Sequence, residues 1–441
     1  MIALLMTPGV AAGQSSDDEG SGLELSPAVS VSTLYRSNVY LQEGSAGGGE
    51  ETTSGVSLKL NPTLEMKLKN SDLDFDLEAA YTARRYLNKE LQNLNRYQDA
   101  SLKAAADVLP TSIVGARVTE TFKSVGRESE GTYAEHAYVR RNSNNVGGHV
   151  SVHPGGALTV NAGGRYQYVD YSVPEDSNAE GSPSLNNKNS YGPAADLKWR
   201  FLPKTAVVAN YAWYAFDWEN NILDARLGDF GDAGDFGEFI GVPDGRAWKA
   251  NAGIRGRITE KLVIGLVGGY GASIYDETSV TNPDSVPDGF DSTDPTHADD
   301  LDVSQGFGTD LQGFPGGLLM STDVTYQPSE GQSFSLGYIK DFQDVYFTNY
   351  VSYDHMFLRY QGLLADRVGL KAETSSRFEQ YFGEVNRSDM SLSSKLEAAY
   401  RSSDILHVET GVNWVARRSL DGNADVEYDD VRVNLGVTLM Y

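Results

Sequence analysis

The stretch SGVSLKLNPTLEMKLKNSDLDFDLEAAYTARRY, residues 54–86, contains two long segments of alternating apolar and polar residues joined by the polar turn KNSD, residues 69–72. One face is apolar from Val56 to Leu68 in the first segment and from Leu73 to Ala83 in the second. A period of two predicts β-strands, because successive side chains of a strand point to opposite faces. Strands of globular proteins have about 5 to 6 residues, whereas a tilted membrane-spanning strand needs about 9 to 11. The stretch therefore predicts a membrane-spanning β-hairpin.

The composition of the 441 residues agrees with a single large barrel. The chain has no run of about 18 apolar residues, which excludes transmembrane helices. Its 25 Tyr, 16 Phe and 46 Gly suit many strands, aromatic girdles and tight turns. It has no Cys, so disulfides, thiolate metal sites and a Cys nucleophile are excluded. The formal charge of -25 makes nucleic acid a poor partner, because phosphate binding relies on clustered Lys and Arg.

The N-terminal segment is typical of secretion. Residues 1–13 contain a short apolar run followed by Val10-Ala11-Ala12, a small-residue cleavage site, although the basic region that usually opens a signal peptide is missing. Residues 14–22 are acidic and rich in Ser and Gly, and we expect them to be disordered. We expect residues 23–441 to form the barrel.

The rest of the chain repeats one pattern, which consists of a long alternating segment, a tight turn, a second alternating segment and a polar loop. Counting short turns and long loops predicts 18 antiparallel strands, with short periplasmic turns and long extracellular loops, as in outer-membrane barrels. The short turns centre on Asn70, Pro110, residues 154–156, 203–204, 259–260, 328–331, 365–366 and 402–404. The longer loops lie near residues 41–53, 88–95, 124–135, 172–189, 217–245, 275–316, 341–349, 381–389 and 418–427.

The last alternating segment also favours an outer-membrane barrel. Its apolar face runs from Val431 to the terminal Tyr441. This resembles the C-terminal strand that the barrel-insertion machinery of the bacterial outer membrane recognises. We interpret Tyr and Trp at strand ends, such as Trp199, Trp213 and Trp248, as anchors at the two lipid interfaces.

The face opposite the apolar one carries charges of both signs, and we expect it to line an aqueous lumen, because lipid accepts ionised groups only at a cost. These charges form either a solvated, mutually neutralising wall or a surface that contacts a hydrated polymer or solute. The candidate lumen-lining residues are Lys59, Glu65, Lys67, Asp74, Asp76, Glu78, Arg117, Arg165, Lys198, Arg200, Arg255, Arg257, Arg359, Lys371, Arg377 and Glu409.

Two predicted outer loops are strongly acidic. Residues 274–316 contain ten carboxylates and no Lys or Arg, and form either a disordered surface segment or an inward-folding gate. The loop 217–245 places Asp229, Asp232, Asp235 and Glu238 at three-residue spacing. Calcium takes 6 to 8 oxygen ligands, so these four are a weak calcium candidate, with a solvated acidic loop as the alternative.

Catalysis finds little support in the sequence. The six His are scattered, apart from His149 and His153 beside a turn. No Gly-x-Ser-x-Gly elbow or phosphate-binding Gly loop occurs. We therefore expect no enzyme activity and no cofactor.

Two segments resemble a known family. Ser26-Pro27 followed by residues 35–40, YRSNVY, is similar to the opening strand of the outer-membrane beta-barrel porin 2 family, and residues 191–214, with the turn LPKT at 202–205, resemble it as well. Members of this family are often linked to exopolysaccharide export. The resemblance implies export of a polysaccharide that a separate periplasmic polysaccharide-export protein delivers to the barrel.

The leading hypothesis is thus an outer-membrane channel for polysaccharide export. The alternative is a general diffusion porin for small solutes, and a third class is a structural or adhesion barrel plugged by its own loops. We expect outer-membrane lipid around the barrel and a monomer, because every flank of the barrel looks uniformly lipid-facing.

Overall fold

The computed structural model describes residues 22–39, 53–96, 98–128, 138–172, 187–218, 244–275, 317–345, 348–364, 367–382, 387–421 and 427–440. The predicted signal peptide, most of the acidic segment 14–22, the loop positions 229–238 and Tyr441 lie outside these residues. No helix within the described ranges is long and apolar enough to span a membrane.

The described residues form strands, with one short 3-10 helix, η1, at Lys89–Arg96. The first nine strands are β1 (Gly22–Arg36), β2 (Gly55–Lys69), β3 (Leu73–Tyr86), β4 (Asp99–Val108), β5 (Val114–Glu128), β6 (Tyr138–Val152), β7 (Leu158–Ser172), β8 (Lys188–Leu202) and β9 (Thr205–Trp218). The other nine are β10 (Gly245–Arg257), β11 (Leu262–Tyr275), β12 (Leu318–Ser329), β13 (Gln332–Val345), β14 (Thr348–Leu364), β15 (Val368–Phe382), β16 (Ser388–Arg401), β17 (Leu406–Ser419) and β18 (Tyr428–Met440).

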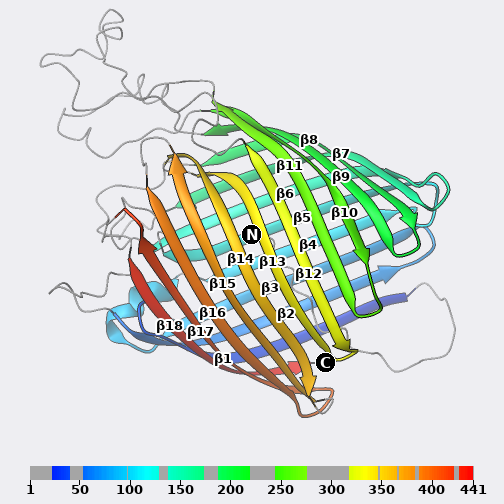
Figure 1. The fold of residues 1–441 in the computed structure, drawn as a ribbon. Helices are drawn as coiled ribbons and strands as arrows, with labels where there is room; N and C mark the ends of the chain where they lie inside the picture. Colours follow the sequence, from blue (N-terminus) through cyan, green and yellow to red (C-terminus); the bar gives the residue numbers. More distant parts are fainter. Residues whose placement is uncertain are drawn as a thin grey trace, which may run out of the picture.

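The strands form one closed antiparallel barrel. Each strand pairs with its neighbours in sequence, and β1 also pairs with β18, so the 18-stranded sheet has no open edge. Figure 1 shows β1 in blue beside β18 in red, with the strands tilted around the wall. The predicted strand number and the antiparallel barrel architecture are confirmed.

The opening hairpin shows how the alternating pattern becomes the wall. Leu64 pairs with Ala79 and Lys67 with Asp76, so the apolar face of one strand continues into that of the next. In the turn, Asn70 Oδ1 accepts hydrogen bonds from the backbone N–H of Asp72 and Leu73, at 2.9 and 2.7 Å. This side-chain turn fixes the hairpin register, as expected for Asn at such a position.

The outer surface of the barrel is apolar. Large side chains on the outward faces of the strands are strongly exposed, including Leu60 at 46%, Leu336 at 60% and Leu435 at 56%. Because no part of the described chain covers these side chains, their burial from water requires lipid. An apolar outer belt around a closed antiparallel barrel is the architecture of outer-membrane proteins.

Two predicted loops differ from the structure. Residues 341–349 were expected to form a long loop, but β13 continues to Val345 and β14 begins at Thr348. The strand extends because Phe342 is fully buried and Asp341 forms an ion pair with Lys249 on β10 at 2.6 Å. The predicted loop 88–95 contains η1, whose Leu91 and Leu94 pack with Val39 and Tyr86.

Candidate functional site: the channel lumen

The predicted lumen-lining residues all alternate onto the face opposite the apolar belt. In β2 and β3, for example, Lys67 pairs laterally with Asp76, and Glu65 pairs with Glu78. The other predicted positions follow the same alternation in β5, β7, β8, β10, β14, β15 and β17. Their contact with a solute or polymer stays a prediction.

Ion pairs connect the inward charges of β3, β4 and β5. Lys103 Nζ lies 2.7 Å from a Glu78 carboxylate oxygen. Arg117 Nη1 lies 3.4 Å from an Asp107 oxygen, and Asp107 pairs laterally with Asp74. Lys59 pairs laterally with Arg84, which forms a 3.1 Å ion pair with Asp99. Lys103 and Asp107 were not among the predicted site residues, although the same alternation places them on this face.

A second set of ion pairs covers the inward face of β14, β15 and β16. Arg359 Nε lies 2.7 Å from Glu373, and Arg377 Nε lies 2.8 Å from Glu379. Lys395 pairs with Glu397 at 2.7 Å, and Lys371 is the lateral neighbour of Glu397. Charges of both signs alternate on these three strands. This part of the lumen surface therefore resembles the mutually neutralising wall, one of the two alternatives that the sequence left open.

The inward face of β5–β10 is different, because it is dominated by cations. Asp196 on β8 is the only carboxylate among the described side chains of this face. We call the cationic set the basic wall. It consists of Arg117, Lys123, Arg141, Arg165, Lys188, Lys198, Arg200, Lys249, Arg255 and Arg257.

The basic wall extends along the whole height of the barrel. Lys188 lies at the loop end of β8, and Arg200 lies near its turn end. Arg165 lies midway along β7, and Lys123 lies in the loop-side half of β5. Arg255, with its side chain 62% exposed, lies 3.0 Å from Asp323 of β12. Three members of the wall pair with carboxylates of neighbouring strands, because Arg117 contacts Asp107, Lys249 contacts Asp341 and Arg255 contacts Asp323. Even with these carboxylates counted, cations outnumber anions along the wall from one end to the other.

A cavity near the turn end of the lumen belongs to this wall. It has a volume of about 330 Å³ and is lined by Arg117, Asp107, His149, His153 and Asn161, among others. The His149 and His153 pair that the sequence singled out thus lies together here. Its surroundings offer hydrogen-bond donors and acceptors to a small polar molecule.

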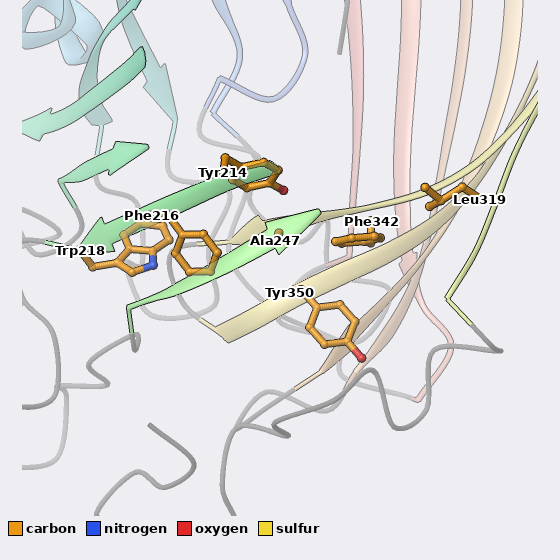
Figure 2. Packing of buried hydrophobic residues seen from close by; sticks show 7 residues of the cluster. All are labelled: Tyr214, Phe216, Trp218, Ala247, Leu319, Phe342 and Tyr350. Atoms are coloured by element: carbon orange, nitrogen blue, oxygen red, sulfur yellow. The ribbon is translucent and has the colours of Figure 1, made fainter. Parts of the chain in front are cut away.

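Aromatic side chains near the loop end of the lumen were missed by sequence reasoning. Tyr214, Phe216 and Trp218 of β9 are buried and face inward, and Figure 2 shows them beside Ala247 of β10. Phe342, Tyr350 and Leu319 complete the cluster. The interpretation of strand-end Tyr and Trp as lipid anchors is therefore wrong for Tyr214 and Trp218.

These aromatics hold two cations of the basic wall. The Arg165 guanidinium carbon lies 4.9 Å from the centre of the Tyr214 ring. Lys188 Nζ lies 4.6 Å from the Phe216 ring centre and 4.7 Å from that of Trp218. Cation–π contacts favour these positions for the cations. The alternation that points Trp213 outward also points Tyr214 inward, so this signal was present in the sequence.

A row of rings also faces the lumen from β14. Tyr353, His355 and Phe357 alternate onto the inward face, with 5.7 Å between the ring centres of His355 and Phe357. The Arg377 guanidinium carbon lies 4.0 Å from the Tyr353 ring centre. Flat rings beside cations and carboxylates form a surface on which planar or ring-shaped solutes can stack.

The predicted calcium ligands Asp229, Asp232, Asp235 and Glu238 lie outside the described residues, so the calcium site stays a prediction. Within the described residues, no group of three or more His, Asp or Glu side chains is placed to hold a metal ion.

No family model matches the chain, and no curated protein matches it. The resemblance to the porin 2 family therefore stays a prediction, whereas the barrel that it implied is observed. Solved structures with a similar fold include the apoprotein of the FrpB iron transporter from Neisseria meningitidis, at 11% identity and a TM-score of 0.47 over 94% of this chain and 81% of that one. A second is OpdK from Pseudomonas aeruginosa with vanillate, at 10% identity and a TM-score of 0.45 over 95% of this chain and 99% of that one. A third is OpdQ from the same organism, at 11% identity and a TM-score of 0.45 over 95% of this chain and 98% of that one. At this level the likeness concerns overall architecture alone.

The closed barrel, its apolar belt and its charged interior place the chain in the outer membrane of a Gram-negative bacterium. A barrel of this strand number is wide enough to enclose an aqueous passage.

Proposed function

We propose that the chain is an outer-membrane channel for small polar solutes and that it favours anions over cations. The basic wall carries this proposal. The whole chain has a formal charge of -25. On the described inward face of β5–β10, by contrast, the cations outnumber the one carboxylate, Asp196. A concentration of one sign of charge along the wall of a passage raises the local concentration of ions of the opposite sign.

The distribution of pairs inside the barrel supports the same reading. Arg359 and Glu373, or Lys395 and Glu397, neutralise each other on β14–β16. On β7, by contrast, the Arg165 guanidinium carbon lies 4.9 Å from the centre of the Tyr214 ring, and a ring carries no net charge that would neutralise it. Anions are therefore expected to follow the β5–β10 side of the lumen.

Ion selectivity tests this proposal directly. The purified barrel is inserted into planar bilayers, and the reversal potential is measured across a potassium chloride gradient. We expect a reversal potential of the sign that marks chloride as the more permeant ion. A cation-selective pore would contradict the anion preference, and absence of conductance in barrels that are demonstrably inserted would contradict an open channel.

Polysaccharide export is the second candidate function. The inward ring row of Tyr353, His355 and Phe357 favours it, because sugar rings stack on aromatic side chains. In that case a separate periplasmic polysaccharide-export protein would deliver the polymer.

Deletion of the gene separates the two candidates. Loss of one surface polysaccharide, restored by complementation, would support export. Unchanged surface polysaccharides together with slower uptake of small anionic solutes would support the solute channel.

A further inference from the structure

Glu120 points away from the lumen, toward the membrane. On β5 it alternates with Arg117 and Thr119 and shares its face with Val118, whose side chain is 53% exposed on the outer surface. Its lateral neighbours are Ala104 on β4 and Val146 on β6, and Val146 is 38% exposed. All of these neighbours belong to the apolar belt, so an ionisable side chain interrupts it.

The depth of Glu120 makes this position costly. It lies near the middle of β5, which runs from Val114 at the short-turn end to Glu128. A strand tilted by about 40° rises about 2.5 Å per residue along the barrel axis. Glu120 is therefore about 15 Å above the start of β5, within an apolar belt about 25 Å tall. Lipid at this depth does not solvate a carboxylate.

Polar neighbours on the same face give Glu120 a first partner. Asn144 Nδ2, on β6, lies 3.4 Å from Glu120 Oε1 as a hydrogen-bond donor. Further toward the loop end, Asn142 Nδ2 donates to Asp170 Oδ2 of β7 at 3.0 Å. A carboxylate can accept several hydrogen bonds, so a single long contact leaves most of its acceptor capacity available to a neighbour in the membrane.

Small residues lie near Glu120 on the outward face, among larger side chains such as Val150 and Tyr166. Ala104, Gly148 and Gly164 lie on the same outward face of β4, β6 and β7. On the opposite side of the barrel, Leu266 and Leu336 are 54% and 60% exposed on the outward face. Small residues beside polar groups are the combination that holds membrane-embedded segments together.

We propose that the outward face around Glu120, formed by Ala104, Val118, Glu120, Asn144, Gly148 and Gly164, is the contact surface for a second copy of this chain. Two copies in one membrane lie at the same depth, so each presents a carboxylate acceptor and an amide donor at the height where the other needs them. The monomer expected from the sequence assumed a uniformly apolar outer surface, and Glu120 and Asn144 break that uniformity.

The absence of Cys from the chain allows a direct test. Single substitutions Val118→Cys and Val146→Cys place a thiol on the proposed surface, and Leu266→Cys and Leu336→Cys serve as controls on the opposite side. Intact outer membranes are treated with a short thiol-specific cross-linker and separated on denaturing gels. We expect products of two or more copies from the first pair and monomers from the controls. Equal cross-linking on both sides, monomers throughout, or a product that contains a different protein would overturn the proposal.

Variants at Glu120 provide the second readout. Glu120→Leu removes the polar group but suits lipid, so we expect folded, heat-modifiable barrels whose cross-linking from Val146→Cys falls at least fivefold. Glu120→Gln keeps hydrogen-bonding capacity and is expected to retain most of the cross-linking. If Glu120→Leu cross-links as efficiently as the parent, Glu120 has no role in the contact.

Discussion

Arg36, the last residue of the first strand, donates two hydrogen bonds from Nε and Nη2 to Asp430 Oδ2 of the last strand, at 3.1 and 2.7 Å. The two residues are 394 positions apart in the chain, and both are buried. Arg432 Nε donates to the same oxygen at 2.6 Å, and the backbone N–H of Asn38 donates to Asp430 Oδ1 at 3.2 Å. This cluster joins the two ends of the barrel sheet at the seam between β1 and β18.

Replacing Asp430 tests the importance of this seam. Asp430→Ala removes the carboxylate that Arg36 contacts inside the seam, and loss of one partner of a buried ion pair costs about 3 to 5 kcal/mol. We expect the free energy of unfolding to fall by that amount, measured by urea titration in lipid vesicles. The matched control is Asp429→Ala, which removes a neighbouring carboxylate that pairs with Arg418, the two side chains being 53% and 42% exposed. It is expected to cost at most about 1 kcal/mol; equal losses in both variants would contradict a special role for the seam.

A second buried cluster lies between β15, β16 and β17. Asp389 accepts hydrogen bonds from Arg387 Nε at 2.9 Å and from Arg417 Nη2 at 2.6 Å, and its side chain is fully buried. Asp389→Ala should lower the temperature at which the barrel loses its compact migration on unheated gels, because two guanidinium groups lose a shared carboxylate. Asp404→Ala is the control, since Asp404 is 91% exposed in its pair with Arg401. A normal melting temperature for Asp389→Ala would show that the cluster is not needed for stability.

Charge reversal on the basic wall should change ion selectivity. Lys198→Glu combined with Arg200→Glu replaces two inward cations on β8 by carboxylates. We expect the reversal potential in a salt gradient to shift toward cation selectivity, because the local potential in the lumen becomes less positive. The double variant is compared with Arg85→Glu, a change of sign on the outward face of β3. If Arg85→Glu shifts the potential as much as the double variant, selectivity does not arise from the lumen wall.

Salt should weaken the same selectivity. The Debye length is about 10 Å at 0.1 M and about 3 Å at 1 M ionic strength. Exposed lumen charges such as Arg255, with its side chain 62% exposed, are screened at the higher concentration. The ratio of anion to cation permeability should therefore approach one as salt rises at a constant gradient ratio. A ratio that is independent of salt would point to narrow steric selection instead.

The alternating pattern determined the architecture. Strand number and the position of most turns followed from a period of two, because the direction of a side chain in a strand depends only on its place in the alternation. The same rule placed Lys59, Arg165, Arg255 and the other predicted lumen residues on the inward face. The same rule also predicts that Tyr214 points inward. The interpretation of strand-end Tyr and Trp as lipid anchors hid this consequence.

The sequence by itself thus determined that the chain is an outer-membrane barrel with a charged interior. Only the tertiary structure decided which charges neutralise each other, that the cations of β5–β10 form one wall, and that Arg36 meets Asp430 across 394 residues. It also decided the depth at which Glu120 faces the membrane. The physical reason is that alternation is a local property, whereas ion pairs and depth depend on the lateral register of strands and on closure of the barrel.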